Sequence, residues 1–182
     1  AYTMTMSGEG RLSNTNALVL NNASSKLLLS SSITVDRVST SLASLGLDVD
    51  ADSTVTSLSV GYTTPVSIAS GKTLSGAITV SAGSIKLDET GTLASTVSMS
   101  GGTLDEDESR TVSGALSQSG AISIDVADGK TLTYSGAARS LGAYTLTLGG
   151  EGTFSNSNAL DLNNASSKLL LSSSITVGKV ST

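Results

Sequence analysis

The sequence predicts an all-β chain that folds as a right-handed parallel β-helix, a β-solenoid. Three observations support this prediction: the two ends of the chain repeat one another, a period of nineteen residues runs through its middle, and Ser, Thr, Gly, Ala, Leu and Val supply most of the residues. Repeats of this kind are typical of proteins whose units stack on one another, because a single unit cannot bury its own apolar face.

The longest repeat joins the two ends of the chain. Residues 1–40 recur at 143–182, an offset of 142 positions, with 31 identities among 40 aligned positions. We therefore divide the chain into 1–142, one complete repeat unit, and 143–182, the start of the next unit and continuous with the first. Copies this similar indicate a recent duplication, so we expect a very long parent protein that carries many units.

A shorter period lies inside the unit. Val66 and Ile68 are followed nineteen positions later by Ile85 and Leu87, and the same spacing leads on to Leu104. Alternating apolar residues separated by segments with Gly or Ser indicate short strands joined by turns. The predicted core ladder, whose side chains we expect to point inward, comprises Ile68, Leu87, Val126, Leu148, Leu74, Leu93, Val112, Leu132 and Phe154.

One apolar position can be followed around the whole unit. It recurs at unequal steps, the shortest of 14 and the longest of 22, which divide the unit into eight blocks with a mean length just under 18. The positions are Leu20, Val35, Val49, Ile68, Leu87, Glu106, Val126, Leu148 and Leu162. A block of this length corresponds to one coil of a parallel β-helix, so we predict about eight coils per unit, with the length differences in the turns.

Two other fold classes fit the sequence less well. A helical fold is disfavoured because Gly recurs throughout and no segment sustains apolar residues at helical spacing. A β-sandwich would need larger aromatic core residues, and it does not explain a translation in register by nineteen residues.

The composition also narrows the function. The chain has no His, Cys or Trp, so it lacks the commonest acid–base side chain and the usual zinc ligands. The net charge is −5 and the Lys and Arg residues are scattered, which disfavours nucleic-acid binding. No apolar run approaches the roughly 20 residues of a membrane-spanning helix, so we expect no such span.

Acidic residues are densest at 105–108. Asp105, Asp107 and Glu108 are candidate Ca²⁺ ligands, because carboxylate oxygens suit this ion. Carboxylates here could instead form the acid–base pair of a polysaccharide-cleaving enzyme, or a charged, solvated face that keeps a fibre soluble. We favour the charged face, and we predict no catalytic residue, no cofactor-binding residue and no cofactor apart from this candidate Ca²⁺.

Other polar patterns also have alternative interpretations. Asn14 and Asn16 recur in the second copy, and asparagine suits turns and amide stacking between coils, so we favour a structural role. Asn22-Ala23-Ser24 matches the acceptor pattern for glycosylation in hosts that modify asparagine. Thr-x-Thr strings such as Thr54-Val55-Thr56 would suit ice binding, but they do not fall on successive coils.

Three strings resemble the repeats of a known class of proteins. They are SIASGKTL at 67–74, VADGKTLT at 126–133 and YTLTLGGEGTF at 144–154. These strings look like the repeats of bacterial autotransporter passengers and filamentous-haemagglutinin-type adhesins, and the resemblance covers essentially the whole chain. The long, nearly identical unit is also similar to the repeats of giant bacterial surface proteins.

This resemblance implies a β-helix on an exported stalk. We therefore expect an extracellular or cell-surface structural protein, not an enzyme, that serves as a long rigid spacer of a fibre or adhesin in adhesion, aggregation or a biofilm-like matrix. Its expected partners are further copies of the repeat, end to end, joined covalently or by self-assembly into a filament. The alternative is a solenoid module that binds polysaccharide or Ca²⁺, ahead of a carbohydrate-active or ice-binding protein.

Overall fold

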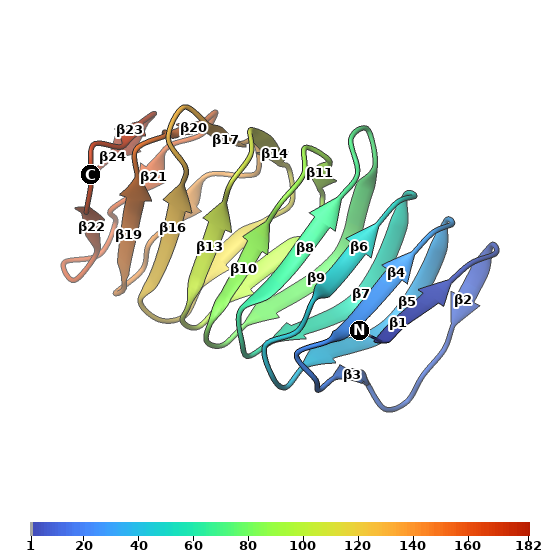
Figure 1. Ribbon diagram of the computed structural model, residues 1–182. Coiled ribbons are helices and arrows are strands. Elements are labelled where there is room, and N and C mark those ends of the chain that lie inside the picture. The colour runs from blue at the N-terminus through green and yellow to red at the C-terminus, as the bar shows by residue number, and fades with distance from the viewer. Residues whose placement is uncertain (1) are drawn as a thin grey trace.

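The computed structural model describes residues 2–182, which fold as a β-solenoid of about nine turns (Figure 1). These residues form 24 strands and no helix, and every strand pairing is parallel. The predicted all-β, parallel solenoid is therefore confirmed. In the same residues there is no helix of the length and apolarity that a bilayer span requires.

Sheet A forms one side of the solenoid and takes one strand from each coil. It has nine strands, and neighbours in the sheet are successive coils along the axis. In order they are β1 (Tyr2–Met6), β4 (Ser25–Leu29), β6 (Gly46–Val49), β8 (Thr64–Ile68), β10 (Ser84–Leu87), β13 (Thr103–Glu106), β16 (Ile122–Val126), β19 (Thr145–Gly150) and β22 (Lys168–Leu171).

Sheet B covers the second side, and in the first coils it also extends over the third. Its main path runs through β2 (Gly10–Leu12), β5 (Ile33–Thr40), β7 (Ser53–Val60), β9 (Thr73–Val80), β11 (Thr92–Leu93), β14 (Arg110–Val112), β17 (Thr131–Tyr134), β20 (Thr153–Asn156) and β23 (Thr176–Val177). On the third side, β3 (Leu18–Leu20) pairs with the end of β5, while β12 (Thr96–Met99) pairs with the end of β9 and with β15 (Leu116–Gln118). Sheet C contains β18 (Arg139–Ser140), β21 (Leu160–Asp161) and β24 (Val180–Ser181).

The long strands of sheet B bend where they pass from the second side to the third. The register between β7 and β9 shifts between Val55 and Leu58. Gly76 lies at this bend with φ of +118°, and a Cβ atom there would be 1.9 Å from the carbonyl oxygen of Val55. Only glycine allows both that backbone conformation and that close approach of the neighbouring coil.

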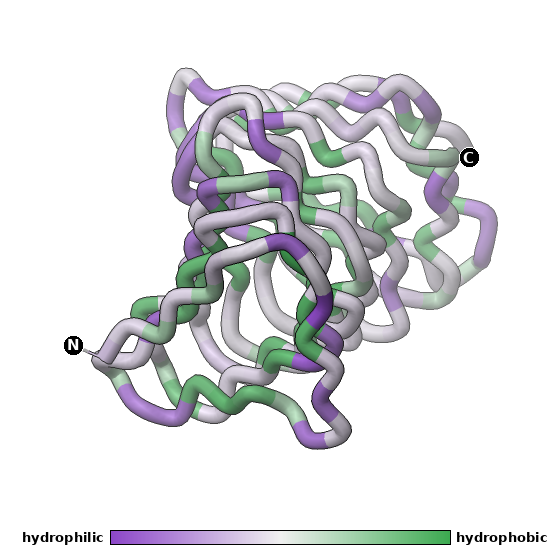
Figure 2. The backbone as a smooth tube through the Cα atoms, turned by 90° about the vertical axis from the view of Figure 1, so that its right-hand side faces the viewer, coloured by the Kyte–Doolittle hydropathy of each residue, from purple (hydrophilic) through white to green (hydrophobic). Residues whose placement is uncertain are grey.

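Inward-facing side chains form a core that runs the length of the stack. All nine residues of the predicted core ladder are buried. Leu93 pairs with Leu74 on one side and with Val112 on the other, at the nineteen-residue spacing. In sheet A the predicted equivalence of Ile68 and Leu87 is wrong by two residues, because Leu87 pairs with Val66, twenty-one positions before it. Figure 2 views the stack from its N-terminal end, with the coils one behind another. Stability therefore comes from contacts between neighbouring coils, as in other repeat proteins.

The number of coils per unit differs from the prediction. Sheet A takes seven steps from β1 to β19, the strand that contains the second copy of β1, whereas eight were predicted. The coils also differ in length, because Leu47 pairs with Val66, nineteen positions on, whereas Ile124 pairs with Leu148, twenty-four positions on. The prediction counted too many coils because Leu20, Val35 and Val49 lie in β3, β5 and β6, on different sides of the solenoid.

The two copies of the repeat pair their strands in the same register. Met4 pairs with Leu27 in the first copy, and the equivalent residues Leu146 and Leu169 pair in the second. On the third side, Leu18 pairs with Val38, and their equivalents Leu160 and Val180 pair in turn. Sequence equivalence between the two copies is thus accompanied by equivalent coil geometry.

Candidate functional site

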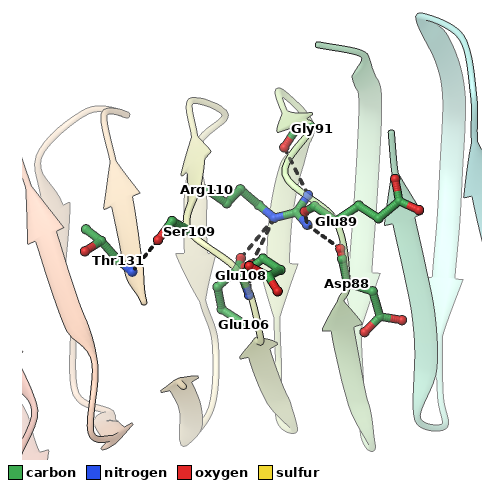
Figure 3. Close-up of polar contacts among 8 residues, drawn as sticks. All are labelled: Asp88, Glu89, Gly91, Glu106, Glu108, Ser109, Arg110 and Thr131. Carbon is green, nitrogen blue, oxygen red and sulfur yellow. Dashed lines mark hydrogen bonds and ion pairs between the residues drawn. The ribbon is translucent and has the colours of Figure 1, made fainter. Parts of the chain in front are cut away.

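A buried ion pair joins β13 to β14 where the chain turns from sheet A to sheet B. The alternation along β13 places Glu106 inward, between Leu87 and Val126 of the neighbouring coils. The first residue of β14, Arg110, is also buried. Its Nε lies 3.1 Å from each carboxylate oxygen of Glu106, and both side chains are 0% exposed (Figure 3).

Arg110 also reaches back to a turn of the preceding coil. Its Nη1 donates to the carbonyl oxygen of Gly91 at 3.1 Å, and its Nη2 donates to the carbonyl oxygens of Asp88, at 3.3 Å, and of Glu89 (Figure 3). A guanidinium group has five N–H donors in a fixed plane, so one side chain can satisfy several carbonyl groups that have no strand partner. Arg110 therefore clamps this turn onto the next coil.

The charge of the pair depends on pH. Burial raises the pKa of Glu106 to about 7, although Arg110 acts in the opposite direction. The backbone N–H of Glu108 donates to Glu106 Oε1 at 3.3 Å. Oε2 is close to Arg110 Nε as part of the ion pair, but it accepts no hydrogen bond. A carboxyl group with this pKa is suited to proton exchange near neutral pH. Because no atom of this side chain reaches the surface, we interpret the pair as a structural clamp.

Lysines from neighbouring coils neutralise acidic residues outside the clamp. Lys86 Nζ lies 2.5 Å from Asp107 Oδ2, and Lys130 Nζ lies 2.6 Å from Glu108 Oε2. The hydrogen bond to Asp107 raises the pKa of Lys86. Asp105 lies in the middle of β13, where partial burial and then the nearby charge of Asp107 raise its pKa. Each bridge links one coil to the next on the outer surface.

These contacts bear on the Ca²⁺ candidates Asp105, Asp107 and Glu108. Two of the three carboxylates already face a lysine. Across residues 2–182, no three or more acidic side chains are gathered as the ligands of a metal ion would be. The structure therefore does not bring the three candidates together as a ligand set, and the lysine bridges favour the charged outer face.

A second buried arginine lies on the third side of the solenoid. Arg139, the first residue of β18, donates through Nη2 to Gln118 Oε1, and Gln118 Nε2 donates to the carbonyl oxygen of Leu141 at 3.2 Å. These contacts connect β15 with β18, two strands that share no backbone ladder. Arg139 Nε and Nη1 have no partner, and burial lowers the pKa of Arg139 to about 10.

Asparagines connect successive coils in the same way in both copies. Asn14 Nδ2 donates to the carbonyl oxygen of Arg37 at 2.8 Å, and Asn156 Nδ2 donates to that of Lys179 at 2.7 Å. In return, the backbone N–H of Arg37 donates to Asn14 Oδ1 at 3.2 Å, and the backbone N–H of Lys179 donates to Asn156 Oδ1 at 3.0 Å. One amide side chain thus replaces two backbone ladder bonds where the chain leaves the strand.

In each of the two buried polar clusters, the sequence pattern singled out one residue and missed its arginine partner. Glu106 and Gln118 occupy positions that are apolar in the preceding nineteen-residue blocks. Their partners Arg110 and Arg139 were not predicted. A polar residue at a core position requires a partner within one turn or one coil, because an unpaired buried polar group is costly. The arginine four residues after Glu106 was the signal available for the first cluster.

Comparison with protein-family models, with curated proteins and with solved structures returned no match. The likeness to autotransporter and haemagglutinin-type repeats therefore depends on the three strings in the sequence. The β-solenoid that this likeness implies is present in the structure, with about nine turns. The identity as an adhesin stays a proposal.

Proposed function

We propose that the chain is part of the structural shaft of a secreted or cell-surface bacterial fibre or adhesin, and that it acts as a long rigid spacer. The observation that carries the proposal is the shared register of the two copies. β1 pairs with β4 as β19 pairs with β22, at equivalent residues. Units that repeat their register in this way can follow one another in one uninterrupted solenoid.

The proposed mechanism is mechanical. Backbone hydrogen bonds and stacked aliphatic residues join each interior coil to the coils on both sides, so stiffness accumulates along the axis. Seven coils per unit, at about 4.8 Å per coil, advance the axis by roughly 34 Å. The number of units would then set the distance over which the fibre reaches.

The proposal gives the chain no catalytic role. Glu106, whose pKa burial raises to about 7, is sealed inside the solenoid. On the outer surface, Asp107 and Glu108 are engaged by lysines. These groups support the stacking of coils, and none of the three presents a free carboxylate pair to a substrate.

The length of concatenated chains tests the shaft. We would express two, three and four units in tandem and measure contour length by electron microscopy and small-angle scattering. The expected result is a rod that lengthens by roughly 34 Å per unit. A matched control places a flexible Gly–Ser segment between units and should bend there. Units that pack side by side, with no steady increase in length, would refute the proposal.

A surface groove supports polysaccharide binding as a second candidate function. Arg11, Asn14, Asp36, Arg37 and Thr56 line an open groove of about 780 Å³. The Arg11 Nη2 atom lies 2.7 Å from Asp36 Oδ1, so the groove presents fixed charges and amides that suit saccharide hydroxyl groups. Binding on a glycan array that is lost in Arg11→Ala would support this candidate, and an empty array would remove it.

A further inference from the structure

The first and last strands of sheet A among residues 2–182, β1 and β22, present edges of different kinds. Among residues 2–182, β1 pairs only with β4, and β22 pairs only with β19. Apolar side chains are exposed at both ends: Met4 is 50% exposed in the first coil, and Leu171 is 50% exposed in the last. Exposed strand edges with apolar side chains are surfaces on which another strand can be added.

The interior of the chain shows which strand fits the edge of β1. The second copy of β1 lies in β19, and there the equivalent edge is covered by β16. Ile122 pairs with Leu146 and Ile124 pairs with Leu148, and both leucines are buried. On the next two sides, β17 pairs with β20 and β18 pairs with β21. Residues 119–142 therefore form the coil that covers this edge.

The first coil is adapted to the same partner despite its substitutions. Met4 and Met6 stand where the second copy has leucines, and exchange of leucine for methionine preserves side-chain volume well. Asp125 pairs with Gly149, and Ser7 is the equivalent of Gly149 in the first copy. A serine hydroxyl can donate to the carboxylate of an aspartate placed in this register.

The opposite end requires a different strand. β22 is the second copy of β4, and the corresponding edge of β4 is covered by β6. Leu29 pairs with Val49 in that interface and is fully buried, whereas its equivalent Leu171 is half exposed. The two ends of this chain therefore do not complement each other, because each one needs a coil that the other does not present.

From these contacts we propose that the edge formed by β1, β2 and β3 docks one specific partner, the coil of residues 119–142 of another copy of the repeat, in the register that β16 adopts on β19. This inference rests on the proposed shaft, and it names the surface through which units join. It also predicts that joining depends on which coil of the repeat unit is presented to this edge, so that any coil other than residues 119–142 binds poorly.

The test uses the full 182-residue chain and two synthetic peptides. The first peptide comprises residues 119–142. The control comprises residues 96–118, which contain the preceding coil (β13, β14 and β15) together with β12. Fluorescence anisotropy should show saturable binding of the first peptide and binding at least tenfold weaker for the control. Met4→Asp in the chain should weaken binding of the first peptide at least tenfold. Val180→Asp, the matched change at the opposite end, should leave it unchanged.

Disulfide trapping reads out the register, since the natural chain has no cysteine. Chain variant Met4→Cys should cross-link readily to a peptide with Ile122→Cys and at least tenfold more slowly to one with Ser123→Cys, whose side chain faces the other side of the strand. Equal binding of both peptides, equal trapping rates, or sensitivity to Val180→Asp would each overturn the inference. Rod length per unit is measured without these peptides, so the shaft and the docking rule can fail separately.

Discussion

Replacement of Arg110 by leucine tests the buried clamp. The change removes the contact with Glu106 and the hydrogen bonds to the carbonyl oxygens of Gly91, Asp88 and Glu89. Leucine is the residue that the next coil carries at the paired position, because Arg110 pairs with Leu132. The variant therefore keeps the pattern of the core while it leaves the carboxyl group of Glu106 without a cation.

The expected loss follows from the environment of Glu106. Removal of one partner from a buried ion pair typically lowers the free energy of unfolding by about 3 to 5 kcal/mol, since the remaining charge is buried without compensation. A double variant, Glu106→Val with Arg110→Leu, copies the residues of the following coil and should recover most of that loss. Lys130→Leu removes an exposed bridge and should cost at most about 1 kcal/mol.

Urea unfolding followed by circular dichroism, at pH 8 and at pH 5, measures these differences. The loss in Arg110→Leu should be smaller at pH 5, because a neutral Glu106 no longer needs a cation. Hydrogen exchange should place the weakened amides in β13, β14 and the turn that Arg110 contacts. A loss no larger than that of Lys130→Leu, or a double variant as unstable as the single one, would refute the clamp.

Three further predictions concern single features of the chain. In the natural chain the folded-state pKa of Glu106 is about 7, above its ordinary value of 4.5, so the folded state holds an extra proton between these values. Unfolding titrations should therefore show stability falling by about 3 kcal/mol as pH rises from 4.5 to 7, and Glu106→Gln should flatten this slope. Gly76→Ala should destabilise the chain by more than about 1 kcal/mol in urea, since its Cβ would meet the Val55 carbonyl oxygen at 1.9 Å. Arg139→Met should leave the unfolding free energy unchanged or raise it, because two nitrogen atoms of Arg139 are buried without partners, and a marked loss would show that its contact with Gln118 is essential.

Much of the fold could be predicted because its signals are local. Strand alternation is visible in the sequence, and the register of Leu74, Leu93 and Val112 follows from a constant spacing of nineteen. The coil count was harder to predict because apolar positions look alike on all sides of a solenoid. Nothing in the sequence marks Leu20 as lying on a different side from Val35.

The candidate site was less predictable because it depends on contacts between coils. The acidic run at 105–108 was visible, but its division into an inward Glu106 and outward neighbours follows from strand alternation at one turn. The lysines that face Asp107 and Glu108 belong to the adjacent coils, so a full turn of the solenoid separates each from its partner in the sequence. These pairs can be predicted from the sequence only when the number of residues in each coil is known.

The buried pair also bears on how the coils find their register. In the structure Ile85 pairs with Leu104, but a slip of two residues would pair Leu87 with Leu104 and keep every aliphatic side chain inward. That slip costs little apolar burial. It would, however, carry Glu106 and Arg110 away from the turn at 88–91 and leave buried charges and carbonyl groups without partners. Aliphatic ladders thus stabilise many registers, and the polar pair penalises all but one. The Glu106→Val, Arg110→Leu variant should accordingly remain stable yet give more than one set of NMR signals for β10 and β13, whereas a single set would assign register to the turns alone.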